Sequence, residues 1–195
     1  MSPTVSLVAV SGSLHSPSKT TVLITEILNS FAEALREHVD VETRLIELSE
    51  VGREFSGALR RDELGPRAEE AVRQIESATL LIIASPVYRA SFTGLFKHVF
   101  DFVGQYSLID KPVLLAATGG SDRHALIIEH QFRPLFSFFQ ALTLPIGVYA
   151  SDADFVDYRI ESTALRERIA QAVSRGVPVV RGTLPEPTSP YVSSW

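Results

Sequence analysis

The chain has 195 residues, of which 45% are hydrophobic and 21% charged, and its formal net charge is −5. The length is typical of a single domain, and the composition is that of a globular protein, which excludes a disordered or fibrous chain. The acidic balance argues against a general nucleic-acid-binding protein, which usually carries a basic patch. The absence of cysteine excludes disulfides, thiolate metal sites and a cysteine nucleophile. No apolar run approaches the ~20 residues that span a bilayer, and the N-terminus lacks a basic signal-peptide start, so we expect a cytoplasmic protein without a membrane partner.

Short apolar runs rich in branched residues alternate with longer segments that have helical spacing. The predicted strands are residues 5–10, 41–48, 80–84, 113–117 and 144–150. The predicted helices are residues 18–38, 66–77, 93–103, 121–142 and 162–175, and residues 52–65 are expected to form a long loop. This alternation predicts a parallel sheet covered by helices on both faces. The size fits a flavodoxin-like, doubly wound five-stranded sheet of order 2-1-3-4-5.

The last residues differ in composition from the rest of the chain. Residues 177–195 are rich in proline and serine and include Tyr191 and Trp195. We therefore expect one flavodoxin-like domain over residues 1–176 and a mobile C-terminal tail over 177–195. A tail that docks its aromatic residues on a neighbouring molecule is the alternative.

The loop after the first predicted strand combines several groups that bind anions. Residues 11–20 offer five hydroxyls, one glycine, one imidazole and one ammonium group, and they lead into a helix. In a sheet of this order, ligands bind at the carboxyl ends of the strands, and a helix N-terminus supplies free N–H groups and a positive dipole end. The loop thus predicts a phosphate site. An ordinary helix cap is the alternative, but a cap needs only one hydroxyl.

The spacing in this loop also indicates which kind of phosphate it binds. Neither G-x-x-x-x-G-K-[ST] nor G-x-G-x-x-G is present, because Gly12 is the loop's single glycine. A single phosphate is therefore favoured over a dinucleotide pyrophosphate. This points to a mononucleotide such as FMN.

Two further loops end at the same predicted edge of the sheet. After the third strand, Pro86 stiffens the turn and Tyr88 offers a flat amphipathic surface. After the fourth strand, Thr118 is followed by the pair Gly119 and Gly120. The alternatives are a plain loop-to-helix junction with a surface tyrosine and a glycine pair that ends the strand.

The second loop resembles the signature of a known family. The pattern P-x-Y-x-x-S-x-x-G-x-x-K is present as Pro86, Tyr88, Ser91, Gly94 and Lys97, and it resembles the motif of the NADPH-dependent FMN reductase family. The first loop is similar to that family's G-S-x-R-x-x-S phosphate loop, and the resemblance covers about residues 4–175. Within the family, the chain is most similar to FMN reductases of two-component alkanesulfonate monooxygenase systems, and in particular to the methanesulfonate branch. The segment 151–154 shares that similarity.

The resemblance implies a cofactor, a hydride donor and a set of contacts. The cofactor is FMN, the donor is NADPH or NADH, and hydride passes to the flavin without a catalytic residue or a metal ion. The residues implied to bind the FMN phosphate are Ser13, His15, Ser18 and Thr20. Those implied to contact the ring and ribityl chain are Pro86, Val87, Tyr88, Arg89, Thr118, Gly119 and Gly120. The two glycines would allow the ring edge to approach the backbone closely, because they lack a Cβ. The hydroxyl and ammonium groups of the same loops add Ser11, Lys19 and Ser91 to the candidate site.

One position departs from the family pattern. His15 stands where the family usually has arginine, and a neutral imidazole binds phosphate less well than a bidentate guanidinium. Weak, pH-dependent retention of FMN follows, which suits a protein that releases its flavin. His15→Arg is expected to tighten FMN binding.

The predicted helix over residues 121–142 has more apolar residues than one core-facing stripe holds. A second buried face favours a homodimer or homotetramer built through the third and fourth predicted helices; packing under the C-terminal tail is the alternative. Pro134 clashes with the carbonyl of His130, which predicts a kink or π-bulge near residues 128–132. The resemblance to the sulfonate-system reductases implies a π-helix at an oligomer interface near the flavin, with His130 acting in flavin exchange. A buried core histidine is the alternative.

These features favour an NAD(P)H-dependent FMN reductase that supplies reduced FMN to a partner flavin-dependent monooxygenase. A quinone or azo reductase that keeps its flavin is an alternative within the same class. A flavodoxin-like electron carrier and a regulatory nucleotide-binding module are non-enzymatic alternatives. Such carriers are usually far more acidic than this chain, which has a net charge of −5.

Overall fold

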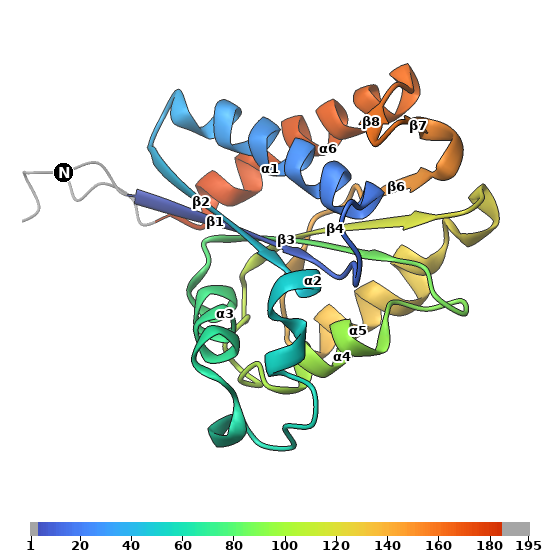
Figure 1. Ribbon diagram of the computed structural model, residues 1–195. Helices are drawn as coiled ribbons and strands as arrows, with labels where there is room; N and C mark the ends of the chain where they lie inside the picture. The colour runs from blue at the N-terminus through green and yellow to red at the C-terminus, as the bar shows by residue number, and fades with distance from the viewer. Residues whose placement is uncertain (1–3, 185–195) are drawn as a thin grey trace, which may run out of the picture.

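The computed structural model describes residues 4–184 and shows a sheet between two layers of helices (Figure 1). Its main strands are β1 (Thr4–Ser11), β2 (Asp40–Glu47), β3 (Leu80–Pro86), β4 (Pro112–Gly119), β5 (Leu142–Thr143) and β6 (Val148–Ser151). The order is β2-β1-β3-β4-β5, with β6 also paired to β4, and every pair in this sheet is parallel. The predicted flavodoxin-like, doubly wound fold is confirmed.

Helices cover both faces of the sheet, as Figure 1 shows. One layer consists of α1 (Lys19–Arg36) and α6 (Thr163–Gly182), and the other contains α3 (Pro66–Ser77), α4 (Gly94–Asp101) and α5 (Arg133–Phe138). Successive side chains of a strand point to opposite faces. In β1, Leu7 and Ala9 accordingly pack with α1 and α6, whereas Val8 and Val10 pack with the other layer.

The fifth predicted strand is interrupted, which corrects the prediction of one strand over residues 144–150. The chain pairs with β4 in β5, leaves the sheet, and pairs with β4 again in β6. Pro145 has no N–H group to give to a ladder. The Arg133 side chain donates hydrogen bonds to the carbonyls of Leu144, at 3.0 Å, and Pro145, at 3.1 Å. Arg168 likewise donates to the carbonyl of Gly147, at 3.0 Å.

The predicted helix over residues 121–142 is broken into three parts, so its continuity was predicted wrongly. A 3₁₀ turn (Asp122–His124) is followed by a π-helix (Ile128–Phe132) and then by α5. The π-helix lies where Pro134 predicted it, which confirms that prediction. His130 is exposed at its centre, so the alternative of a buried core histidine is wrong.

Two other segments also differ from the sequence prediction. Helix α2 (Leu48–Val51) begins at the last residue of the second predicted strand, and the predicted loop over residues 52–65 contains 3₁₀ turns at Gly52–Glu54 and Arg61–Glu63. Helix α6 continues to Gly182 although Pro178 lies inside it, because buried residues such as Val173 and Val180 extend its apolar face. The predicted tail is thus helical over 177–182, and its aromatic residues lie outside the described part of the chain. Within residues 4–184, no helix is long and apolar enough to cross a membrane.

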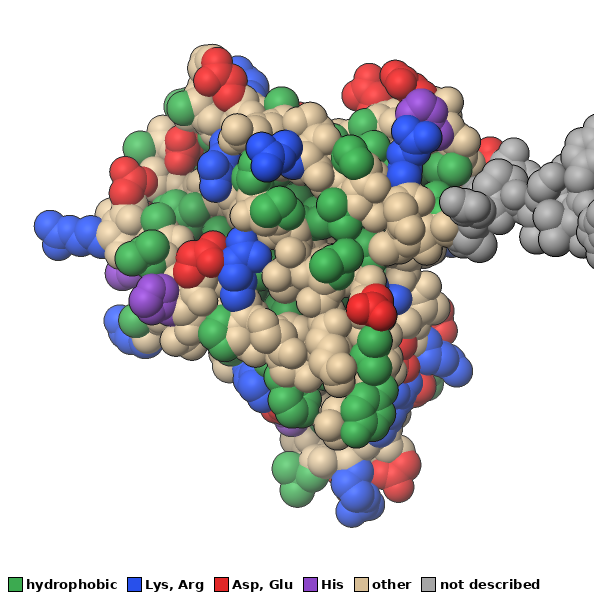
Figure 2. All heavy atoms as spheres, turned by 180° about the vertical axis from the view of Figure 1, so that it is seen from behind, with side chains coloured by type: hydrophobic (Ala, Val, Ile, Leu, Met, Phe, Trp, Pro, Cys, Tyr) green, Lys and Arg blue, Asp and Glu red, His purple; other side chains and the backbone are tan. Residues whose placement is uncertain are grey.

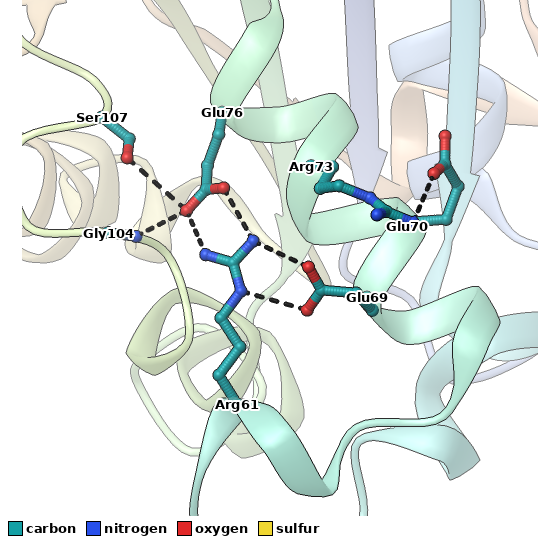
Figure 3. Close-up of polar contacts among 7 residues, drawn as sticks. All are labelled: Arg61, Glu69, Glu70, Arg73, Glu76, Gly104 and Ser107. Carbon is teal, nitrogen blue, oxygen red and sulfur yellow. Dashed lines mark hydrogen bonds and ion pairs between the residues drawn. The ribbon is translucent and has the colours of Figure 1, made fainter.

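An ion-pair network centred on Arg61 holds the segment before α3 (Figure 3). The Arg61 guanidinium donates two hydrogen bonds to Glu69, both 3.0 Å, and two to Glu76, of 2.6 and 2.8 Å. Glu76 also accepts from the Gly104 N–H at 2.8 Å and from the Ser107 hydroxyl at 3.5 Å. Burial acts to raise the pKa of Glu76, but these bonds outweigh it and lower that pKa below its ordinary value. The network therefore ties three segments together through one ionised carboxylate.

Glu76→Gln is expected to lower the free energy of unfolding at neutral pH by about 1–2 kcal/mol, because it removes charge-assisted hydrogen bonds. A glutamate whose pKa is lowered on folding stabilises the protein above its unfolded pKa of about 4.3. That stabilisation is lost as the pH falls through the lowered pKa of the folded state. The difference between wild type and Glu76→Gln, measured by urea unfolding over a series of pH values, should shrink accordingly on acidification.

Glu70→Gln is the matched control on the same helix. Glu70 pairs with Arg73 at 3.1 Å, and both side chains are exposed (Figure 3). Exposed pairs of this kind contribute at most about 1 kcal/mol. Equal effects of the two substitutions at neutral pH would contradict the stabilising role of the Arg61 network.

Candidate functional site

The loops that follow β1, β3 and β4 meet at the carboxyl edge of the sheet, at the right of Figure 1. Together with residues after β6 they enclose a cavity of about 350 Å³. The residues that line it are Ser13, His15, Pro17, Ser18, Lys19, Thr20, Pro86, Val87, Tyr88, Thr118, Gly119, Gly120, Asp152 and Tyr158. This is the position at which sheets of this order bind their ligands.

The floor of the cavity consists of hydroxyls and the start of α1. Ser18 caps the helix, and its hydroxyl accepts a hydrogen bond from the Thr21 N–H at 3.3 Å. Lys19 and Thr20 open the helix, so their N–H groups precede its hydrogen-bond ladder. The buried Thr20 hydroxyl lies 2.6 Å from that of Thr118 and so joins α1 to the end of β4. This arrangement presents several donors and the positive end of the α1 dipole to an anion.

The loop after β3 forms a tight hairpin beside this floor. Tyr88 and Ser91 exchange two backbone hydrogen bonds, of 2.8 and 3.1 Å, across a turn at Arg89 and Ala90. Both turn residues are left-handed, with φ of 50° and 66°, which costs about 1–2 kcal/mol each outside glycine. The Val87 N–H donates to the carbonyl of Thr118 at 2.8 Å. The hairpin thereby holds Tyr88, which is 42% exposed, against the cavity.

The structure brings most of the predicted site residues together. Those that line the cavity are Ser13, His15, Ser18, Lys19, Thr20, Pro86, Val87, Tyr88, Thr118, Gly119 and Gly120. Arg89 lines an adjoining pocket of about 310 Å³ with Val87 and Tyr88. Two predicted residues are engaged elsewhere: the Ser11 hydroxyl lies 2.9 Å from that of Thr21, and the Ser91 hydroxyl donates to Gln131 Oε1 at 3.2 Å. Neither of these two lines the cavity.

Sequence reasoning missed three residues of the cavity wall, namely Pro17, Asp152 and Tyr158. Asp152 lies in a 3₁₀ turn (Asp152–Asp154) after β6. Tyr158 lies at the tip of the hairpin between β7 (Phe155–Val156) and β8 (Arg159–Ile160), where its φ is 58°. The similarity of residues 151–154 to the sulfonate-system reductases was the one signal that pointed to Asp152.

The two glycines at the end of β4, Gly119 and Gly120, have different roles. A Cβ on Gly119 would lie 2.3 Å from the hydroxyl oxygen of Tyr149, which donates to the carbonyl of Ser121 at 2.5 Å. A Cβ on Gly120 would meet only Asp152 Oδ2, at 3.9 Å. Gly119 thus makes room for Tyr149 besides lining the cavity, and Gly120 faces nearly open space, where the close approach of a ligand to the backbone stays a prediction. Burial, followed by the charges of three nearby aspartates, raises the pKa of Tyr149.

Comparison with known proteins defines the family. Residues 5–155 match the family described as NADPH-dependent FMN reductase. The chain is 53% identical over 179 residues to the NADH-dependent FMN reductase SfnE of Pseudomonas putida, covering 92% of this chain and 94% of that protein. It is 49% identical over 176 residues to a protein of Pseudomonas aeruginosa named FMN reductase (NADPH), covering 90% and 92%.

Solved structures agree with this assignment. An oxidoreductase from Corynebacterium diphtheriae superposes with a TM-score of 0.84 at 30% identity, covering 92% of this chain and 98% of that one. The apo form of the NADH:FMN oxidoreductase EmoB gives 0.78 at 26% identity, covering 94% and 92%. The chain belongs to the NADPH-dependent FMN reductase family and is an NAD(P)H-dependent oxidoreductase.

The residues of the cavity fit the chemical groups of FMN. Hydroxyls and helix N–H groups at one end match the acceptors of a phosphate, and the lining contains one lysine for its negative charge. At the other end, Pro86, Val87 and Tyr88 present the apolar and aromatic surface that a flat ring system requires. FMN, when bound, supplies the hydride-accepting ring, and the chain supplies the phosphate donors and the wall against that ring.

Gly119→Ala is expected to lower the free energy of unfolding by about 1–3 kcal/mol, because the new methyl group displaces Tyr149 from a packed site. Urea unfolding at neutral pH measures the loss. In Gly119→Ala/Tyr149→Phe, part of the loss should be recovered, since the hydroxyl that makes the 2.3 Å contact is removed.

Gly120→Ala is the matched control, with a change of stability within about 0.5 kcal/mol. A Gly119→Ala variant as stable as wild type would show that Tyr149 does not require this glycine.

Proposed function

We propose that this protein transfers hydride from NADH or NADPH to FMN, bound at the carboxyl edge of the sheet, and releases the reduced FMN to a partner flavin-dependent monooxygenase of the alkanesulfonate type. The family supports FMN reduction, and the phosphate-binding floor beneath an open cavity is the structural observation that carries the proposal. Both coenzymes are included because the names of the two curated relatives above differ in this respect.

The phosphate end of the site favours exchange of FMN over permanent retention. Its proposed ligands are the hydroxyls of Ser13, Ser18 and Thr20 with the N–H groups at the start of α1. None of these donors is a guanidinium, so they do not give the phosphate the bidentate pair of charge-assisted bonds that an arginine provides. His15 is exposed at the rim, where a bidentate guanidinium would hold the phosphate more firmly.

The ring end of the site accounts for the hydride transfer without an acid or a base. Pro86 and Val87 are the proposed wall against the flavin ring, with Tyr88 and Arg89 at its margin. The strained turn at Arg89 and Ala90 fixes that wall, so the ring is oriented by rigid backbone. The cavity mouth leaves the other face of the ring open to a nicotinamide.

Oxidation of NADH and NADPH, followed by absorbance while FMN is titrated into nearly colourless protein, tests the function. The rate should rise with FMN and saturate. His15→Arg should lower the Kd for FMN by about tenfold, since it adds a charge-assisted bidentate contact. A yellow protein that needs a quinone but no added FMN would contradict release of the flavin, and absence of oxidation in every condition would contradict the enzyme.

A second part of the proposal is a homodimer or homotetramer built through α4 and the segment from the π-helix to α5. These elements flank a groove of about 600 Å³, lined by Lys97, Phe100, Asp101, Val103, Gln105, Leu135, Phe138 and Phe139. Leu126 and Phe138 are 64% and 61% exposed. Figure 2 shows hydrophobic side chains at the surface among charged groups of both signs. Exposed apolar patches of this kind mark interaction sites.

The π-helix adds a proposed link between this interface and the flavin. Gln131, next to His130, accepts a hydrogen bond from Ser91 of the Tyr88 hairpin, and Phe132 packs edge-on against Phe92, with ring centroids 5.4 Å apart. These contacts support a role for the exposed His130 in flavin exchange, in which the π-helix responds to the flavin loop.

Phe138→Glu is expected to reduce the molar mass in sedimentation equilibrium to that of a smaller oligomer or a monomer, because a charge replaces a large apolar side chain in the proposed interface. Leu59→Glu is the matched control: Leu59 is 85% exposed in the connection before α3, and its substitution should leave the mass unchanged. A monomeric wild-type protein would contradict the proposed interface.

A further inference from the structure

The rim of the proposed phosphate site holds a carboxylate of the protein itself. Lys19 Nζ and Asp152 Oδ1 form an ion pair of 2.8 Å between the start of α1 and the turn after β6. Both residues line the same cavity as Ser13, Ser18 and Thr20. Among the described residues that line this cavity, Lys19 is the only lysine or arginine. The one fixed cation available to a phosphate is thus already paired.

The turn that carries Asp152 is firmly held in place. The Asp154 carboxylate accepts hydrogen bonds from the N–H and the hydroxyl of Ser151, at 2.7 and 3.1 Å. The backbone carbonyl of Asp154 accepts a bond from the N–H of Glu161 at 3.0 Å, which closes the base of the β7–β8 hairpin. On the other side of the pair, the Lys19 ammonium also lies 5.9 Å from the centroid of the Phe155 ring. The contact therefore joins two fixed elements.

Asp152 is not the only carboxylate near this end of the cavity. Asp122 of the loop after β4 and Asp154 of the same turn act with Asp152 on Tyr149, whose pKa their negative charges help to raise after burial. His15 and Lys19 face this rim from the loop before α1 and from α1 itself. A phosphate that reaches this end of the cavity carries a charge of about −1.5 to −2 at neutral pH. It therefore meets an acidic rim and a lysine that is neutralised by its partner.

We propose that Asp152 sets the affinity for FMN by competing with the flavin phosphate for the Lys19 ammonium, and that it thereby promotes release of the flavin. This inference rests on the proposed function, which places FMN in the cavity. When the phosphate takes the ammonium, Asp152 loses its partner and faces a like charge at close range. The penalty depends on the phosphate, so riboflavin, which has the same ring and no phosphate, does not incur it. Asp152 is thus an affinity-determining residue that does not itself contact the reacting ring.

A purely structural role of Asp152 makes the opposite prediction. If the carboxylate only held Lys19 in the correct place, its removal would leave the ammonium mobile and would weaken FMN binding. If the ion pair only tethered the turn to α1, its removal would change FMN and riboflavin binding alike. Comparison of the two flavins separates all three roles.

The test is the Kd for FMN and for riboflavin, measured by quenching of flavin fluorescence, in wild type and in Asp152→Asn. The substitution should lower the Kd for FMN by about fivefold, as expected for the loss of one repulsive charge near the rim. It should leave the Kd for riboflavin unchanged. The gain for FMN should shrink as salt is added, because exposed charges are screened.

Asp157→Asn is the matched control. It removes the same charge from the exposed tip of the β7–β8 hairpin, which follows the turn of Asp152, and the φ of 46° at Asp157 is one that asparagine tolerates well. Asp157 does not line the cavity, and the Kd for FMN should change by less than about twofold, since the charge is farther from the phosphate.

An unchanged or higher Kd for FMN in Asp152→Asn would overturn the inference, as would an equal gain for riboflavin. Failure of the proposed function has a different signature. A wild-type protein that binds FMN but oxidises neither NADH nor NADPH would lose the proposed function, while the effect of Asp152 on FMN binding would still be measurable.

Discussion

The parallel register of β1, β3 and β4 is the constraint on which the site depends. It pairs Ser11 with Ala84 and Pro86 with Thr118, so the three strands end side by side. Three hydrogen bonds then cross-link the loops that follow: Thr20 with the Thr118 hydroxyl at 2.6 Å, Val87 with the Thr118 carbonyl at 2.8 Å, and Thr93 with the Gly12 carbonyl at 3.0 Å. Because Thr118 serves two of these bonds, a shift of β4 by one residue would separate the start of α1 from the loop after β3.

The proposed phosphate site contains few positively charged side chains. Its floor uses hydroxyls and the amides of a helix start, and the single lysine at its rim is already paired with Asp152. A bidentate arginine at the position of His15 would add a stronger contact for the phosphate. In the proposals above, both features lower the affinity for FMN, as expected of a reductase that treats FMN as a substrate and passes it on. A moderate affinity for FMN is therefore part of the proposed function.

The sequence predicted those features that depend on local physics. Apolar runs located the strands, the hydroxyl-rich loop located the floor of the cavity, and Pro134 located the π-helix. The interruption of the fifth strand escaped prediction because the side chain of Arg133, from a different element, takes the carbonyls of Leu144 and Pro145. The length of α6 escaped prediction because packing outweighs the penalty of Pro178. In each of these cases the deciding contact is tertiary.

The residues of the cavity wall also divide into those that local sequence predicts and those that only tertiary structure brings there. Ser13, Ser18 and Thr20 belong to one short segment whose composition already indicates anion binding. Asp152 joins them only because the chain returns to the same edge, and its partner Lys19 is 133 residues away. Periodicity and spacing carry no information on such a pair, and a single aspartate in a loop has no distinguishing pattern.

The position of the flavin phosphate in a crystal structure of the FMN complex tests the central claim most directly. We predict that the phosphate oxygens lie within hydrogen-bond distance of the hydroxyls of Ser13, Ser18 and Thr20 and of the first N–H groups of α1. The ring should lie against Pro86 and Val87. A phosphate bound elsewhere, or a flavin that enters with its ring at the start of α1, would contradict it.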